Sequence, residues 1–406
     1  MADDIRLKRT LSLPLLVLYG LGTTIGAGIY ALVGKIAGEA GYLAPFVFLL
    51  AAAMASLTAL SFGELCRRYP YSAGEAVYIR EAFHWEWLST VVGLLVVLTG
   101  IVSAAALVNG FIGYLGEFLE VQPSLTIVLT CLVLGALAGW GIAESVTVAA
   151  IVTLIEVGAL LAIVWLGLEQ TANPFGSWVA QWPETDWSSL GLVFGGATLA
   201  FYAFIGFEDM VNVAEEVRDV ENTMPRAIIL TLLISTLVYL LLMLVAVLTV
   251  TPDELSKSEA PLSLVYRQLT GGDSTVISVI GLFAIINGAL IQIVMAARVM
   301  YGQAIMGQLP GGLGRIHGRT QTPLIATALV TGLVAAMALI GDLAGLARTT
   351  SLLMLTVFAL VNLALWKIKR GRRSPVSFRP LPIWVPIAGF FVRSGMVLNE
   401  LVHRLF

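Results

Sequence analysis

The sequence predicts an all-helical integral membrane protein, and three observations support this fold class. Only 12% of the 406 residues are charged and 58% are hydrophobic, whereas a soluble domain carries about 25% charged residues. The mean hydropathy is +0.91, and the apolar residues form stretches long enough to cross a bilayer as helices, which takes about 20 residues. Two of these stretches also contain glycine clusters, which predict helices that are broken at mid-membrane.

Eleven apolar segments are candidates for membrane-spanning helices. In chain order they are residues 12–36, 42–66, 86–116, 123–141, 145–168, 188–217, 225–250, 275–303, 323–341, 345–367 and 383–402. The first is too long for a signal peptide and lacks a small-residue cleavage site, so we expect it to remain as the first helix. The last is the weakest candidate because it contains Arg393, and it either spans the membrane or lies at its surface.

The basic residues of the loops predict how these helices are oriented. Lys and Arg gather in every second loop, and cytoplasmic loops of membrane proteins carry this excess. These loops hold Arg6, Lys8, Arg9, Arg67, Arg68, Arg80, Arg218, Arg226, Arg315, Arg319, Lys367, Lys369, Arg370, Arg372, Arg373 and Arg379. The opposite loops hold only Lys35, Lys257, Arg267 and Arg348. We therefore expect a multi-pass protein of the plasma or inner membrane with a cytoplasmic N-terminus.

The first glycine cluster lies in the middle of the first apolar segment. Residues 22–30 read Gly-Thr-Thr-Ile-Gly-Ala-Gly-Ile-Tyr, and each glycine inside a helix costs about 1 kcal/mol relative to alanine. Unwound backbone at membrane depth is tolerated only where it is buried in protein or lines a cavity, because lipid cannot satisfy its N–H and C=O groups. The cluster therefore predicts a site for a polar ligand inside the membrane.

The sixth segment repeats this pattern, with Gly206 followed at once by Glu208 and Asp209. Gly26 and Gly206 are 180 residues apart, which is five spans with their loops. An odd number of spans inverts the second copy relative to the first, and paired interruptions in inverted halves point to a transporter's binding site. Exposed N–H groups at one broken end suit a carboxylate, and exposed carbonyls suit an ammonium. Alternatively, the glycines only let helices pack closely.

Other site chemistries find no support in the sequence. Cys66 and Cys131 lie in different apolar segments without metal-ligand spacing, so we expect free buried thiols. No HExxH, GxSxG or GxxxxGK[ST] motif is present. We therefore expect no enzyme, cofactor, metal site or nucleic-acid partner; the oligomeric state stays open.

Three patches of the chain resemble the amino acid–polyamine–organocation (APC) transporter family. They are residues 22–29 (GTTIGAGI), residues 64–78 (ELCRRYPYSAGEAVY), and residues 201–227, which run from FYAFIGFE through AEEVR to MPRA. The resemblance implies a LeuT-type fold, in which two inverted repeats of five helices have their first helices broken. It divides a single transporter domain of residues 1–406 into helices 1–5 (residues 1–170), helices 6–10 (residues 186–370) and about one extra C-terminal helix (residues 380–406).

The resemblance also implies which residues bind substrate. The substrate carboxylate would meet the N–H groups of Ala27 and Gly28, and its ammonium the carbonyls of Thr24, Tyr202 and Ile205. The full set of expected substrate-binding residues is Thr23, Thr24, Gly26, Ala27, Gly28, Tyr202, Ala203, Phe204, Ile205 and Phe207. Tyr202 stands where relatives often carry an aromatic gate, and its hydroxyl needs a partner at depth. As residues alone, Tyr202, Phe204 and Phe207 could equally be packing residues.

Two acidic residues are candidates for ion coupling. Many relatives carry a lysine in helix 5 that replaces a sodium ion, and the matching position here is Glu156. A carboxylate near the bilayer centre is costly if charged, so Glu156 is either protonated between helices, titrates during transport or coordinates a cation. Glu208 either caps the second half-helix or carries a proton.

The function that follows is secondary transport of amino acids by alternating access, coupled to protons or run as exchange. The apolar run 101–106 favours a neutral or apolar substrate side chain; a charged Glu156 or Glu208 in the pocket would favour cationic amino acids, amines or polyamines. An alternative of another class is a non-transporting sensor or complex subunit that retains the fold.

Overall fold

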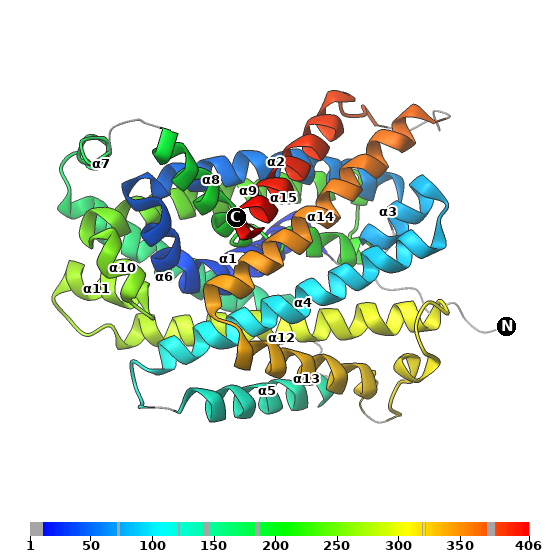
Figure 1. The fold of residues 1–406 in the computed structure, drawn as a ribbon, viewed down its shortest axis with the longest axis horizontal. Helices are drawn as coiled ribbons and strands as arrows, with labels where there is room; N and C mark the ends of the chain where they lie inside the picture. The colour runs from blue at the N-terminus through cyan, green and yellow to red at the C-terminus, as the bar shows by residue number, and fades with distance from the viewer. Residues whose placement is uncertain are drawn as a thin grey trace.

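In the computed structural model, long helices run side by side along the longest axis of the molecule (Figure 1). The structure describes residues 11–70, 74–120, 122–140, 146–182, 187–318, 320, 322–371 and 378–405. The expected basic residues Arg6, Lys8 and Arg9 lie outside the described residues, as do Arg319, Arg372 and Arg373.

In the described chain, ten of the eleven apolar segments correspond to one long helix each, with ends within a few residues of those expected. The sixth segment comprises the helix α8 (Trp187–Tyr202), a turn and the short helix η2 (Glu208–Glu216). The long helices are α1 (Leu13–Ala40), α2 (Ala44–Arg68), α4 (Glu86–Leu115), α5 (Pro123–Trp140), α6 (Val146–Gln170), α8 (Trp187–Tyr202), α9 (Val220–Thr249), α12 (Thr275–Ile305), α13 (Leu324–Ile340), α14 (Leu343–Arg370) and α15 (Trp384–Leu405). Between them lie the short helices η1 (Gly41–Leu43), α3 (Gly74–Phe83), α7 (Pro174–Val179), η2 (Glu208–Glu216), α10 (Pro252–Lys257), α11 (Pro261–Thr270) and η3 (Gly311–Gly314). Hydropathy does not predict these short helices, apart from η2, which belongs to the sixth segment.

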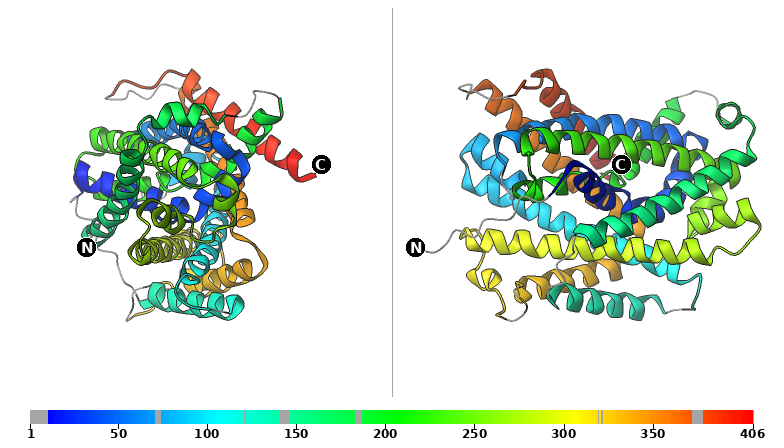
Figure 2. Two further views of the ribbon diagram at one scale, coloured as in Figure 1. Left: turned by 90° about the vertical axis from the view of Figure 1, so that its left-hand side faces the viewer. Right: turned by 180° about the vertical axis from the view of Figure 1, so that it is seen from behind.

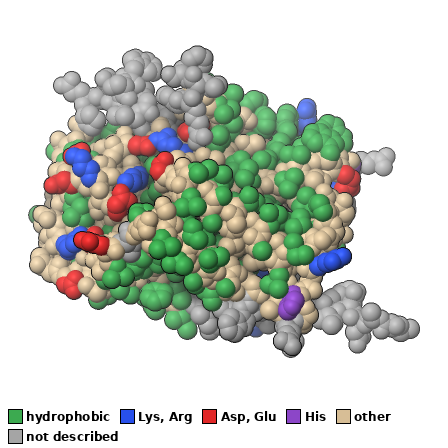
Figure 3. Space-filling view, turned by 60° about the horizontal axis from the view of Figure 1, so that its bottom comes forward, with side chains coloured by type: hydrophobic (Ala, Val, Ile, Leu, Met, Phe, Trp, Pro, Cys, Tyr) green, Lys and Arg blue, Asp and Glu red, His purple; other side chains and the backbone are tan. Residues whose placement is uncertain are grey.

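The outer surface matches a membrane environment. Within the described residues, seven helices are long and apolar enough to cross a bilayer, and three apolar stretches of 10–17 residues accompany them. On the face that includes α5 and α13, hydrophobic side chains cover the middle and charged ones gather toward the two ends (Figure 3). Leu125, Leu129 and Leu132 of α5 are examples of exposed leucines. Such a broad apolar belt is costly in water and natural in lipid.

The helices pack in pairs that combine an early and a late part of the chain. α2 packs along α9, α4 along α12, and α5 along α13, while α1 contacts both α6 and α9. α5 and α13 form the outermost pair at the bottom of Figure 1, and the end-on view of Figure 2 separates them from the group of α2, α8 and α9. α1 lies inside the bundle, and most residues of its middle are buried by the neighbouring helices.

Arg393, which made the last segment the weakest candidate, is fully buried in α15. Its guanidinium donates to the hydroxyl of Thr58 at 3.1 Å and to the carbonyl of Met54, both on α2. It also lies 4.6 Å from the ring centre of Phe201 on α8, a cation–π contact. These contacts satisfy the guanidinium inside the protein, so α15 is an apolar helix that docks onto α2, α8 and α14 through its arginine.

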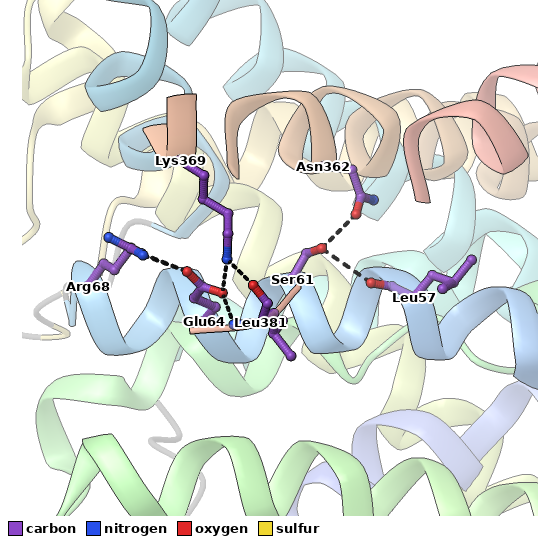
Figure 4. A network of polar contacts seen from close by, with 7 residues as sticks. All are labelled: Leu57, Ser61, Glu64, Arg68, Asn362, Lys369 and Leu381. Atoms are coloured by element: carbon purple, nitrogen blue, oxygen red, sulfur yellow. Dashed lines mark hydrogen bonds and ion pairs between the residues drawn. The ribbon is translucent and has the colours of Figure 1, made fainter. Parts of the chain in front are cut away.

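Polar contacts also hold the C-terminal ends of α2 and α14 together (Figure 4). Glu64 accepts from Arg68 at 2.6 Å on its own helix and from Lys369 of α14 at 2.6 Å. The N–H of Leu381 donates to the same carboxylate at 2.8 Å, which ties down the segment that leads into α15. One turn away, Ser61 donates to Asn362 at 2.7 Å. Because these groups are mostly buried, each bond is worth more than an exposed ion pair.

Candidate functional site

The backbone departs from helical geometry at both glycine clusters. α1 leaves helical geometry at Gly26, where φ is −40° and ψ is −127°. α8 ends at Tyr202, a turn covers residues 203–207, and η2 begins at Glu208. Within that turn Gly206 has φ of +128°, a conformation that residues with a Cβ atom rarely adopt. The glycines therefore lie where the backbone departs most from a helix.

The two interruptions touch each other. The hydroxyl of Thr23 lies 2.9 Å from the carbonyl oxygen of Gly206. A Cβ atom added to Gly206 would lie only 2.4 Å from the carbonyl oxygen of Thr23. The fully buried Tyr239 of α9 joins the two segments, since its hydroxyl is 2.7 Å from the carbonyl of Thr24 and 2.8 Å from that of Ala203. Residues far apart in sequence thus form one backbone junction.

A small cavity lies at this junction, between α1, α4, α8, η2 and α12. Its lining residues are Gly22, Thr23, Thr24, Gly28, Ser103, Leu107, Tyr202, Ile205, Asp209, Gly288, Ile291 and Gln292. The cavity volume is about 30 Å³, enough for a water molecule or two and too small for an amino acid. The lining combines backbone, neutral polar groups and the apolar side chains of Leu107, Ile205 and Ile291 with one carboxylate.

Five of the ten expected substrate-binding residues line this cavity, namely Thr23, Thr24, Gly28, Tyr202 and Ile205. The hydroxyl of Tyr202 lies 2.9 Å from the hydroxyl of Ser103 on α4. It therefore has the hydrogen-bond partner that a buried hydroxyl requires. Gly26 forms the kink of α1, and Ala203 contributes the carbonyl that Tyr239 contacts. The side chain of Ala27 lies outside the described part of the structure.

The side chains of Phe204 and Phe207 pack in the aromatic core, and neither residue lines the cavity. Phe204 packs against Tyr239, with ring centres 5.2 Å apart. Phe207 packs against Phe62 at 6.0 Å and Phe358 at 5.4 Å. Both are fully buried, so burial against neighbouring rings determines their orientation. They support the turn around Gly206 from behind.

The two candidate coupling residues lie near the junction without lining the cavity. Glu156 of α6 is 3% exposed, and its Oε1 has no hydrogen-bond partner among the described residues. Its main-chain carbonyl accepts from the hydroxyl of Tyr30 on α1 at 3.0 Å. Glu208 accepts from the N–H of Gly206 at 2.8 Å, so this carboxylate stabilises the turn.

Sequence reasoning missed several residues of the site. Ser103, Gln292 and Asp209 line the cavity, and Tyr239 joins the two interruptions. Asp209 directly follows Glu208, and its position in the sequence indicates no role of its own. The other three stand in apolar helices, and no sequence signal distinguishes their inward faces. In the described residues, no group of three or more His, Cys, Asp and Glu side chains could hold a metal ion.

Glu75 adds a buried carboxylate behind the junction. It lies on α3, which is too short to span the membrane, and is 5% exposed. Burial raises the pKa of Glu75 from 4.5 to about 7, a hydrogen bond from its own backbone lowers it, and the nearby charge of Asp209 raises it. A proton therefore binds Glu75 more tightly in the folded protein than in the unfolded chain.

This shift predicts a pH-dependent stability. Because the pKa of Glu75 is higher in the folded state, its contribution is most favourable below pH 4.5 and is lost as the pH rises toward about 7. We expect Glu75→Gln to be more stable than wild type at pH 8, by about 3 kcal/mol at most, and similar to it near pH 4.5. Thermal unfolding in detergent across this range measures the difference. Glu81→Gln, on the same helix but more exposed, should leave the pH dependence unchanged.

The helices and the junction between them define a multi-pass membrane protein with a polar site in its interior. Its family follows from comparison with known proteins: the model of the amino acid permease family matches residues 11–399, and the chain belongs to that family. Membership of this family was expected from the two glycine clusters and from residues 64–78, and the match confirms this expectation.

Individual relatives agree with this assignment. "Cationic amino acid transporter 4, vacuolar" of Arabidopsis thaliana is 30% identical over 378 residues, which cover 88% of this chain and 62% of the relative. An uncharacterized transporter of Mycobacterium tuberculosis is 30% identical, and the match covers 84% of that transporter. A branched-chain amino acid permease of Bacillus subtilis is 26% identical over 386 residues, 90% of this chain and 82% of the permease. The chain thus spans 62% of the length of the Arabidopsis transporters.

Proposed function

We propose that this protein is a secondary transporter that binds an amino acid at the junction of α1 with the α8–η2 turn and carries it across by alternating access. The observation that carries the proposal is the meeting of two interrupted helices at one buried cavity. Free N–H groups of a helix end attract a carboxylate, and free carbonyls attract an ammonium. An amino acid offers both groups on one carbon, so main-chain atoms alone can hold it.

The pairing of helices supports an architecture of two inverted repeats. In the proposed LeuT-type arrangement, residues 1–170 form the first repeat, residues 186–370 the second, and residues 380–406 the extra helix. The equivalent helices would be α2 and α9, α4 and α12, and α5 and α13; each of these pairs is in contact. Equivalent elements that meet pairwise are expected of two copies related by a twofold axis within the membrane.

Transport in this proposal requires the helices around the cavity to separate. A cavity of about 30 Å³ cannot hold an amino acid, so substrate entry must widen it from one side at a time. We infer that α1, α2, α8 and α9 move against α4, α5, α12 and α13, with Gly26 and Gly206 as hinges. The protein would act in the plasma or inner membrane with its N-terminus in the cytoplasm, as the loop charges favour.

Uptake by the purified protein in proteoliposomes tests this function. Labelled amino acids, one at a time, should accumulate when a proton gradient or an internal amino acid is supplied, and empty liposomes should take up none. Binding without any flux would support the alternative of a sensor or a complex subunit. Neither binding nor flux for any amino acid would contradict the proposal.

We propose that Glu156 takes part in proton or cation coupling. It lies against α1, and its Oε1 has no hydrogen-bond partner in the described structure. An unpaired buried carboxylate oxygen favours the binding of a proton or a cation. We expect Glu156→Gln to keep substrate binding but to lose most of the pH dependence of uptake. Uptake at several pH values and cation compositions measures this. Glu169→Gln, exposed near the end of the same helix, is the control. Unchanged rate, pH dependence and cation dependence in Glu156→Gln would exclude the role.

The class of amino acid is the remaining part of the proposed function. The relatives include transporters named for cationic and for branched-chain amino acids, so family membership leaves both classes open. The apolar Leu107 and Ile291 in the lining would suit a neutral side chain. The single carboxylate in the lining is the feature that favours a cationic one.

A further inference from the structure

Asp209 is the carboxylate that lines the cavity, and it has no counter-charge there. It stands in the first turn of η2, directly after Glu208. Its side chain is 93% buried, since 7% of its surface is exposed. Oδ2 of Asp209 has no hydrogen-bond partner among the described residues. A buried carboxylate in this state is costly unless something binds to it.

The surroundings of Asp209 make this end of the cavity negative. None of the residues that line the cavity is Lys, Arg or His. Glu208 lies beside Asp209, and its carboxylate is already used by the N–H of Gly206. Glu75 of α3 is close enough for the charge of Asp209 to act on it. Carboxylates that face a cavity without basic partners attract a cation from outside the protein.

In the proposed function, main-chain atoms of the junction hold both charged groups on the α-carbon of an amino acid. A neutral amino acid therefore has no use for Asp209 and would leave its carboxylate buried and unpaired. A substrate with a second positive charge would instead supply the missing partner. Discrimination of this kind, in which the wrong substrate leaves a buried polar group unpaired, is stronger than discrimination by shape alone.

We propose that Asp209 is a specificity-determining residue that binds an ammonium or guanidinium group on the side chain of the substrate. The transporter then prefers cationic amino acids, or amines of similar length, over neutral ones. This inference rests on the proposed function, because it assumes that the cavity is the substrate site. In this proposal, main-chain atoms bind the α-carboxylate and α-ammonium of the substrate, and Asp209 binds the positive charge of its side chain.

Uptake of labelled lysine, arginine and leucine by the full chain in proteoliposomes tests the inference. We expect wild type to prefer lysine and arginine, and Asp209→Asn to raise KM for both at least about tenfold. Leucine uptake by Asp209→Asn should be unchanged or improved, because the amide no longer leaves a charge unpaired. Asp253→Asn, which removes an exposed carboxylate of α10, is the matched control and should behave as wild type.

A second measurement covers a variant that reconstitutes poorly. In detergent, lysine should raise the melting temperature of wild type and of Asp253→Asn, and should not raise that of Asp209→Asn or Asp209→Ser. Equal effects of Asp209→Asn on lysine and leucine would overturn the inference. So would a loss of proton-driven accumulation with lysine affinity intact, since Asp209 would then serve coupling.

The two proposals fail in different ways. A wild-type protein that transports leucine and is not inhibited by excess lysine or arginine would overturn the role of Asp209 and leave amino acid transport standing. A wild-type protein that neither binds nor transports any amino acid would overturn the transport function and, with it, the specificity assigned to Asp209.

Discussion

Gly206→Ala is expected to abolish most amino acid transport. The added Cβ would lie 2.4 Å from the carbonyl oxygen of Thr23 and 2.6 Å from its carbonyl carbon, and both are backbone atoms that cannot swing away. The φ of +128° adds strain, because such conformations cost non-glycine residues about 1–3 kcal/mol. Relief of the clash must push the two interrupted segments apart, so we expect uptake to fall at least about tenfold.

The control for this variant is Gly195→Ala. Gly195 lies in α8, the same helix that ends before the turn, and a Cβ atom there would meet nothing within 4 Å. We expect normal uptake and slightly higher thermal stability, because alanine is favoured over glycine in a helix by about 1 kcal/mol. Uptake in proteoliposomes and thermal unfolding in detergent, measured on both variants, separate a site effect from a general loss of fold. Wild-type uptake by Gly206→Ala would show that the junction tolerates separation.

Tyr239→Phe is expected to have the second largest effect. Its hydroxyl serves the carbonyl of Thr24 on one interrupted segment and that of Ala203 on the other. Removal of one buried hydrogen-bonding group typically costs about 1–3 kcal/mol, and here both segments lose their common partner. We expect uptake to fall about tenfold while the ring contacts with Phe48 and Phe204 keep the fold intact.

Initial uptake rates together with substrate affinity measure this effect. Tyr266→Phe on α11 is the control, because its hydroxyl makes no hydrogen bond to any described residue in the structure. If Tyr239→Phe transports at the wild-type rate, the hydroxyl does not hold the junction together. If it only lowers thermal stability, its role is limited to packing.

The aromatic residues after Phe201 show a limit of prediction from the sequence, namely which side of the chain each ring faces. Tyr202, Phe204 and Phe207 follow one another within six positions and could all be substrate contacts or all be packing residues. The turn that begins after Tyr202 separates them: Tyr202 faces Ser103 across the cavity, whereas Phe204 and Phe207 face the core. Since helical periodicity fails inside a turn, residue spacing could not predict which side each ring takes.

Arg393 is the opposite case, because this residue made its own segment the weakest candidate for a membrane-spanning helix. An arginine in an apolar segment is costly in lipid, and sequence alone could not reveal the partners that offset this cost. They come from α2 and α8, more than 190 positions earlier in the chain. The same holds for Tyr239 and Gln292, whose roles depend on which face of a long apolar helix turns inward.

The sequence by itself determined the class of protein, the order and approximate ends of the long helices, the two glycine interruptions and the family. Each of these depends on local properties: hydropathy over about 20 residues sets a span, and glycine spacing sets where a helix is easily broken. Only the tertiary structure decided that the interruptions touch, that Tyr239 joins them, and that Asp209 lines their cavity while the two phenylalanines do not. These facts arise from contacts between distant segments, which no local pattern encodes.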